Sequence, residues 1–169
     1  EKDVEKNVHN ASKVLEDLGA NVEEIDITWK IDPKKAFHVL WTSGAAFLSK
    51  DFTTEEKDLL DPVFREFCKL GSEHSLFTRL EAESSRGENG TVINEILQKF
   101  DLIVGPTMPT VAFKAEDLVP EGWGDDKFDW TPFTYPFNMT CPPAATLNCG
   151  FSNGLPIGFQ IVAKRNFDV

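Results

Sequence analysis

The sequence predicts an α/β protein that ends in a β-hairpin, and three observations support this fold class. A helical pattern at residues 4–18 is followed by a strand pattern at residues 22–27. Residues 102–104 form a short, uniformly apolar run of the kind found in buried strands covered on both faces. Near the carboxyl end, apolar residues alternate on both sides of Asn153-Gly154, a dipeptide that favours a tight hairpin turn. The alternating residues are Ala145, Leu147, Cys149 and Phe151 before the turn, and Leu155, Ile157, Phe159 and Ile161 after it.

The amino-terminal helix is predicted by one apolar stripe that ends before a glycine. Residues 4–18 place apolar side chains at helical spacing, and Gly19 follows as a stop signal. The stripe consists of Val4, Val8, Ala11, Leu15 and Leu18. In residues 22–27, Ile25 and Ile27 alternate with acidic residues, which is the period of a half-buried strand. A helix followed by a strand forms one α/β unit.

A second helix is predicted to begin at Asp32-Pro33, which combines a capping residue with a proline suited to the first turn. This helix carries a wide apolar face formed by Phe37, Leu40, Trp41, Phe47 and Leu48. Ser43-Gly44 lies within it. Small residues at such a position favour close packing of another helix, and we prefer this interpretation to a catalytic serine.

Further helices are predicted up to the apolar strand. Thr53 and Glu56 have the spacing of a capping box, and Pro62 is expected to divide the helix that they open. Another helical run begins at Leu76, and we expect an interruption at residues 87–90, where two glycines occur.

Residues 106–143 show no sustained helical or strand pattern, and so long a stretch is rare in a compact domain unless it is functional. Its aromatic residues are Phe113, Trp123, Phe128, Trp130, Phe133, Tyr135 and Phe137. Those from Trp123 onward suit the wall of an apolar pocket, and they equally suit attachment of an irregular segment to the core. Asn138 follows these aromatic residues. Its side-chain amide suits a turn, a helix cap or a contact with a ligand, and we favour capping. Thr107 lies just beyond a strand end, where α/β sheets place ligands.

Composition argues against several function classes. Lys and Arg number 17 against 28 Asp and Glu, and the net charge of −11 is spread along the chain without a basic stretch. This field disfavours nucleic acids and anionic membranes as partners. Cys68, Cys141 and Cys149 match neither a zinc site nor a disulfide framework, so we expect reduced thiols in a cytoplasmic protein without a metal or cofactor.

The carboxyl-terminal motifs resemble the end of amidase signature family enzymes. Pro-Thr-x-Pro occupies residues 106–109, Phe-Thr-x-Pro-x-Asn occupies residues 133–138, and Gly-Leu-Pro-x-Gly-x-Gln-Ile-Val occupies residues 154–162. Residues 1–100 resemble the family more loosely. The resemblance implies part of the amidase signature fold, a large mixed β-sheet flanked by helices. We expect residues 1–169 to form a single domain portion, truncated at both ends.

The resemblance also implies the hydrolysis of carboxylic amides to an acid and ammonia or an amine. Family members use a serine nucleophile, a second serine in a cis peptide and a lysine, and this chain lacks the motifs that carry them. Ser84-Ser85 resembles the tandem serines but has no glycines before it, so we predict no catalytic residue and no activity for the chain alone. The predicted substrate-binding residues are Pro106, Thr107, Trp130, Phe133, Thr134, Tyr135 and Asn138, with Trp130, Phe133 and Tyr135 on the acyl side.

Two departures from the family pattern affect this interpretation. Cys141 occupies a position where the family often has glycine, so the turn there must form without glycine's freedom. Thr131 occupies a position where amidotransferase subunits tend to carry aspartate, which favours a general amidase with a small-molecule amide substrate. A noncatalytic scaffold module and a subunit of a glutamine-dependent transamidase are the alternatives. An open sheet edge also allows a homodimer.

Overall fold

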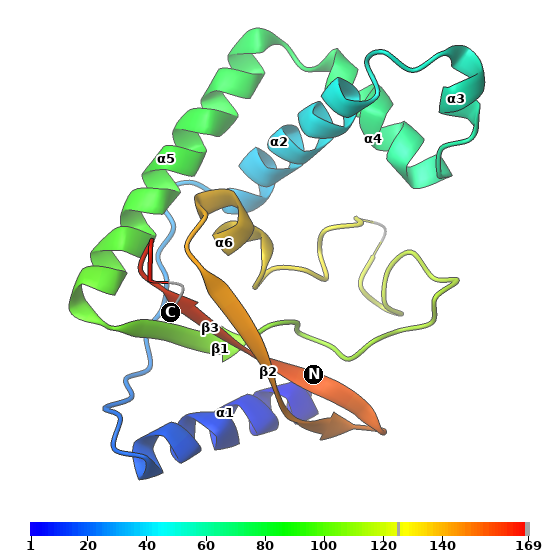
Figure 1. The fold of residues 1–169 in the computed structure, drawn as a ribbon. Coiled ribbons are helices and arrows are strands. Elements are labelled where there is room, and N and C mark those ends of the chain that lie inside the picture. The colour runs from blue at the N-terminus through cyan, green and yellow to red at the C-terminus, as the bar shows by residue number, and fades with distance from the viewer. Residues whose placement is uncertain (125, 168–169) are drawn as a thin grey trace. The chain divides into compact units, whose positions relative to one another are not determined.

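The computed structural model describes residues 1–124 and 126–167 (Figure 1). The chain divides into two compact units. The sheet unit consists of Glu1–Thr28 and Thr91–Val169, and the helical unit is Trp29–Gly90. The single domain expected from the sequence stays a prediction. Among the described residues, no helix is both long enough and apolar enough to pass through a membrane.

Three antiparallel strands form the sheet and, together with the helices, confirm the predicted α/β class. β1 (Leu102–Pro106) and β2 (Ala144–Ser152) both pair with β3 (Leu155–Ala163), which lies between them (Figure 1). The predicted hairpin is therefore confirmed. Asn153 and Gly154 have φ angles of 50° and 79°. A type I′ turn requires such left-handed values at both of its central positions.

A β-bulge at Cys149 changes which residues of β2 share a face. Asn148 pairs with Gly158 and Gly150 pairs with Ile157, so Cys149 is the extra residue. Side chains on the two sides of the bulge therefore do not follow one simple alternation. The alternation predicted for the whole strand is wrong, because an extra residue shifts the register by one and exchanges the two faces.

Two other strand predictions are wrong. Residues 22–27 form no strand, and Ile25 is 38% exposed. Alternation does not supply the hydrogen-bonding neighbour that a strand requires, and the sheet contains only β1, β3 and β2 within the described residues. In β1, Ile103 is buried but Leu102 is 49% exposed, so this strand is not covered on both faces by the chain itself.

Helix α1 (Lys2–Asp17) confirms the first predicted helix and packs against the sheet. Val4 of its apolar stripe is buried. The Ser152 hydroxyl, at the end of β2, donates a hydrogen bond to Asp3 Oδ2 at 2.6 Å. Gly150 permits a close approach of the helix, because a Cβ at this position would overlap Asn7 Oδ1.

Helix α2 (Pro33–Leu48) begins where its capping residues predict. Asp32 Oδ1 accepts a hydrogen bond from the Lys34 backbone N–H at 2.9 Å. The predicted apolar face is covered only in part within the chain. Its last two members, Phe47 and Leu48, are 68% and 69% exposed.

The next two helix starts also follow local capping chemistry. Thr53 and Glu56 form both hydrogen bonds of a capping box, which opens the short helix α3 (Thr54–Asp58). Asp61 then caps α4 (Pro62–Glu73) by accepting the backbone N–H groups of the first turn. The division predicted at the proline is confirmed.

Helix α5 (Leu76–Lys99) continues through Gly87 and Gly90, so the predicted interruption is wrong. Each glycine in a helix interior costs about 1 kcal/mol relative to alanine. Asn89 lies between them and is fully buried. Its Nδ2 donates to the Ile31 carbonyl at 2.9 Å, and its Oδ1 accepts from the Ile31 N–H at 3.4 Å. This paired contact over a long sequence distance helps to offset weak local helix propensity.

Close packing of α2 on α4 involves Gly71 of α4 and the backbone of Thr42 and Ser43 in α2, but not the predicted Gly44. A Cβ on Gly71 would overlap the Thr42 carbonyl oxygen, whereas a Cβ on Gly44 would meet nothing within 4 Å. Thr42 is fully buried, and its Oγ1 donates to the His38 carbonyl at 2.7 Å and lies 2.9 Å from His74 Nε2. The prediction for Gly44 is therefore wrong, because the neighbouring helix approaches a different position.

We predict opposite effects of adding one methyl group at these two helical glycines. Gly71→Ala should lower the free energy of unfolding by about 1–3 kcal/mol, since the methyl would overlap rigid backbone. Gly44→Ala should raise it by up to about 1 kcal/mol through helix propensity, because the added methyl meets open space. Urea unfolding followed by circular dichroism measures both values. Equal effects of the two substitutions would contradict the proposed close approach.

Candidate functional site

The two segments predicted to face a substrate are both attached to β3. The Thr107 backbone N–H donates to the Gly158 carbonyl at 2.9 Å, and Gln160 Nε2 donates to the Phe133 carbonyl at 2.9 Å. The Thr107 bond continues the β1–β3 ladder in the plane of the sheet, and the Thr107 side chain lies over the position that a Gly158 Cβ would occupy. Gly158 and Gln160 are two residues apart on one strand, so their side-chain positions share a face. The structure thus brings the Pro-Thr loop and the aromatic segment to one face of the sheet. We call it the Gly158–Gln160 face.

Thr107 sits on this face because Gly158 has no side chain. A Cβ on Gly158 would lie 2.7 Å from Thr107 Oγ1 and 2.9 Å from Thr146 Cγ2. The hydroxyl oxygens of Thr107 and Thr146 are 3.1 Å apart, which forms a hydrogen bond above the glycine. Pro106, the preceding predicted residue, is half-buried and ends β1 opposite Phe159.

Sequence reasoning missed Thr146, and the bulge explains why. The Asn153-Gly154 turn pairs Ser152 with Leu155. Continuing that register without a bulge would place Thr146 opposite Ile161, whereas the structure pairs it with Gln160. The extra residue moves Thr146 to the Gly158–Gln160 face. No local pattern in the sequence marks that shift.

The predicted aromatic wall is covered to different degrees. Phe133 is 37% exposed, Trp130 is half-buried, and Tyr135 is buried. The Trp130 ring meets the Phe113 ring edge-on, with centroids 5.0 Å apart and an interplanar angle of 86°. Trp130 Nε1 is buried without a hydrogen-bond partner among the described residues. Thr134 is half-buried and donates through Oγ1 to the Thr131 carbonyl at 3.2 Å.

A short helix, α6 (Tyr135–Thr140), lies inside the stretch for which the sequence predicts no regular structure. Asn138 is exposed and lies within this helix, so the capping role favoured for it is wrong. Thr134 is the N-cap and Cys141 is the C-cap, with φ and ψ of 59° and 37°. The structure therefore builds the left-handed turn with cysteine, at a cost of about 1–2 kcal/mol relative to a right-handed conformation.

Neither Ser85 of the tandem serines nor the Cys149 thiol is activated as a nucleophile. Ser85 is buried on α5, and its Oγ donates to the Glu81 carbonyl at 2.9 Å, a bond within the helix. Burial raises the pKa of the Cys149 thiol, which lowers the reactive thiolate fraction near neutral pH. In the part of the chain that the structure describes, no cluster of three His, Cys, Asp or Glu side chains is suited to a metal ion.

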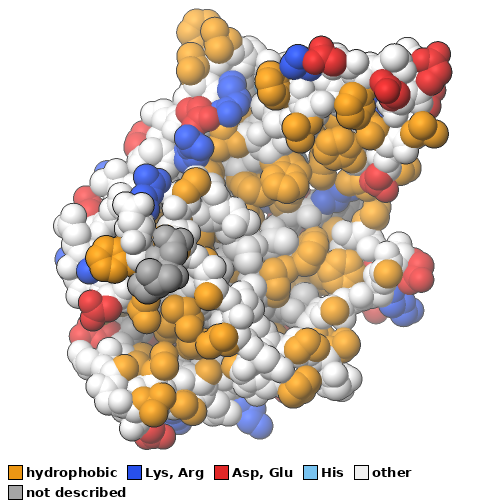
Figure 2. Space-filling model, in the orientation of Figure 1, with side chains coloured by type: hydrophobic (Ala, Val, Ile, Leu, Met, Phe, Trp, Pro, Cys, Tyr) orange, Lys and Arg blue, Asp and Glu red, His pale blue; other side chains and the backbone are white. Residues whose placement is uncertain are grey.

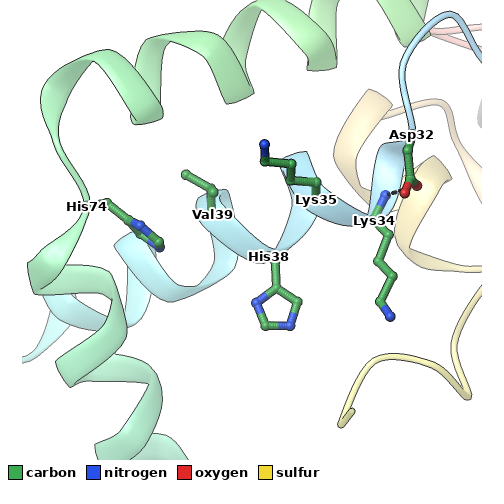
Figure 3. A pocket seen from close by; sticks show the side chains of 6 residues that line it. All are labelled: Asp32, Lys34, Lys35, His38, Val39 and His74. Carbon is green, nitrogen blue, oxygen red and sulfur yellow. Dashed lines mark hydrogen bonds between the residues drawn. The ribbon is translucent and has the colours of Figure 1, made fainter.

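A hollow of about 360 Å³ lies in the helical unit (Figure 3). Its lining residues are Asp32, Lys34, Lys35, His38, Val39 and His74. Lys35 and His38 point away from each other, and the Asp32 carboxylate is engaged by the Lys34 backbone N–H (Figure 3). No serine lines this hollow, and none of the predicted substrate-binding residues belongs to it. Its side chains therefore do not form a nucleophile and base pair.

A family model described as Amidase matches residues 1–169. The chain belongs to the amidase family. This confirms the resemblance that the carboxyl-terminal motifs indicate. A glutamyl-tRNA(Gln) amidotransferase subunit of Lysinibacillus sphaericus is 29% identical, and the match covers 94% of this chain and 37% of that protein. The acylamidase of Rhodococcus erythropolis is 28% identical, with 94% of this chain and 35% of that protein covered.

Solved structures of amidases share the fold of this chain. A crystal structure of an amidase superposes with a TM-score of 0.88 at 21% identity, covering 98% of this chain and 39% of that one. A bacterial aryl acylamidase of the amidase signature family superposes with a TM-score of 0.81 at 20% identity, covering 99% and 38%. The chain thus spans little more than a third of the length of these relatives.

We predict that Gly158→Ala displaces Thr107 and destabilises the sheet. The added methyl would overlap the Thr107 and Thr146 side chains and should cost about 1–3 kcal/mol of unfolding free energy. Gly105→Ala is the matched control, because a Cβ there meets nothing within 4 Å and Gly105 pairs with the same strand. Urea unfolding gives the energies, and the Thr107 amide resonance reports the displacement. Indistinguishable variants would argue against this packing.

Proposed function

We propose that this chain supplies scaffold and substrate-pocket elements to an amidase that hydrolyses carboxylic amides to an acid and ammonia or an amine. The observation that carries the proposal is the attachment of two family motifs to one face of β3. Thr107 from the first motif and Phe133 from the second are both hydrogen-bonded to this strand. Membership in the amidase family supports the reaction class.

The predicted substrate-binding residues take different roles in this proposal. Phe133 offers an exposed aromatic surface, and Trp130 adds an aromatic ring whose buried N–H lacks a protein acceptor among the described residues. These two residues and the buried Tyr135 form the acyl side of the pocket. Thr107 and Asn138 offer a hydroxyl and an amide for the polar part of the substrate. Pro106 and Thr134 fix the backbone beside them.

The catalytic residues of this amidase lie outside the chain. Amide hydrolysis by a serine requires a base and oxyanion donors within hydrogen-bond reach. The described residues present Ser85 bound to its own helix and a Cys149 thiol with a raised pKa. A framework role is consistent with the length of the relatives, of which this chain spans little more than a third.

Exposed apolar side chains favour this role over an independent scaffold module. Figure 2 shows hydrophobic side chains on much of the face in view. In the helical unit, Phe47, Leu48 and Leu59 are largely exposed, as is Phe77. Soluble monomers rarely expose large apolar surface without a partner. The surface is consistent with association, including the homodimer that an open sheet edge allows.

A glutamine-dependent transamidase component is the second candidate function. Several of the most similar relatives are glutamyl-tRNA(Gln) amidotransferase subunits, at identities close to that of the acylamidase. Thr131 favours the general amidase. Its hydroxyl donates to the Phe128 carbonyl at 2.9 Å, and its carbonyl accepts from Thr134. Thr131 therefore stabilises a local turn, and unlike aspartate it offers no negative charge to a polar ligand.

A cytoplasmic location stays a prediction.

We predict that the isolated chain has no amidase activity. Purified protein incubated with a simple aryl acylamide should release no amine above the uncatalysed rate, because neither nucleophile nor oxyanion donors are assembled. A serine-directed fluorophosphonate should likewise label no side chain. Turnover together with labelling of one serine would place the catalytic centre inside the chain and overturn the division of roles.

In the complete enzyme, we predict that truncating the aromatic wall changes substrate preference. Phe133→Ala should lower kcat/KM for bulky acyl amides by about tenfold, which corresponds to about 1.4 kcal/mol, and should affect acetamide-like substrates little. Phe151→Ala is the matched control, since this exposed phenylalanine lies on β2 outside the two motif segments. The ratio of kcat/KM for large and small amides is the measurement. An unchanged ratio would remove Phe133 from the pocket.

A further inference from the structure

Helix α6 is too short to hold its own position. It contains six residues, Tyr135–Thr140, and follows a long irregular segment. Isolated helices shorter than about 12 residues are marginal in water, because the cost of nucleation is not recovered. The orientation of α6 must therefore be set by contacts with other parts of the sheet unit.

Two side chains from β3 and the residues after it hold the two ends of α6. Directly before its N-cap residue, Gln160 Nε2 donates to the Phe133 carbonyl at 2.9 Å. At its end, Arg165 Nη2 donates to the Thr140 carbonyl at 2.7 Å. The second bond joins a cation to a carbonyl at the negative end of the helix, an arrangement that is favourable.

Gln160 is suited to fix the position of the segment before α6, because Gln160 is itself held in place. It is only 6% exposed. Its backbone lies in the central strand, with Gly105 on one side and Thr146 on the other. A buried amide that lost its partner would be costly, so its side chain is strongly directed toward the Phe133 carbonyl.

The orientation of α6 determines which of its side chains is exposed. Five of its six residues are buried, and Asn138 is the exposed one. Phe133, whose carbonyl Gln160 holds, carries the most exposed ring among the aromatic wall residues. A rotation of α6 would turn Asn138 inward, and a shift of its start would move the Phe133 ring.

We propose that Gln160 is a positioning residue, which together with Arg165 fixes α6 and thereby orients Phe133 and Asn138 toward the substrate. Its effect on the substrate rests on the proposed amidase function, whereas its effect on α6 does not. Gln160 does not touch the reacting atoms. Its loss should weaken substrate binding more than it slows the chemical step, because the catalytic groups lie elsewhere.

The first test measures amide hydrogen exchange in the isolated chain. Gln160→Leu keeps the size of the side chain but removes the donor, and Gln98→Leu makes the same change at an exposed glutamine of α5. The expected result for Gln160→Leu is at least tenfold faster exchange of the α6 amides with little change in β1. Unchanged α6 exchange, or equally faster exchange throughout the sheet, would overturn the positioning role.

The second test compares kinetics in the complete enzyme. Gln160→Leu should raise KM for a bulky amide about tenfold with kcat changed less than twofold, and Arg165→Lys should preserve most of the binding. An unchanged KM, or a loss confined to kcat, would overturn the link to substrate orientation. If the complete enzyme hydrolyses no amide, the proposed function fails, and the exchange measurement still decides whether Gln160 fixes α6.

Discussion

The pairing of β3 on both edges is the constraint on which the sheet unit depends. β1 and β2 occupy its two sides, so the backbone of β3 has no freedom to shift without breaking two ladders. The side chains and carbonyl groups of β3 are consequently held in fixed positions, where other segments can form hydrogen bonds with them. The Gly158 carbonyl accepts a hydrogen bond from the Thr107 N–H, and Gln160 Nε2 donates one to the Phe133 carbonyl. Irregular segments far apart in sequence acquire defined positions because both are attached to the same rigid strand.

Features that depend on neighbouring residues could be predicted from the sequence. The Asn153-Gly154 turn works because both residues tolerate positive φ, and the Thr53 capping box works because its partners are three residues apart. Features that depend on distant neighbours were missed or wrong. Residues 22–27 alternate correctly but have no strand beside them, and α5 continues through its glycines partly because Asn89 contacts Ile31.

The same distinction separates the predicted from the missed parts of the candidate site. Motif spacing identified the Pro-Thr loop and the Phe-Thr segment, and the structure attaches both to one strand. It did not identify Thr146, because a single extra residue at Cys149 decides which face Thr146 occupies. Nor did it show that Asn138 is presented by a helix. α6 has too few residues to produce a helical period, and its ends are fixed by Gln160 and Arg165.

The apolar stripe of α2 shows how a correct local pattern can imply a surface that the chain does not cover. Phe37, at its start, is buried, whereas Phe47 and Leu48, at its end, are largely exposed. Full burial of side chains of this size contributes about 1.5–3 kcal/mol each. The apolar face that the helical period predicts is therefore buried at one end of α2 only. Burial of the exposed end would be favourable, and this favours association with further protein. A framework that contributes pocket elements to a larger amidase uses such a surface, whereas an independent monomeric module gains nothing from exposing it.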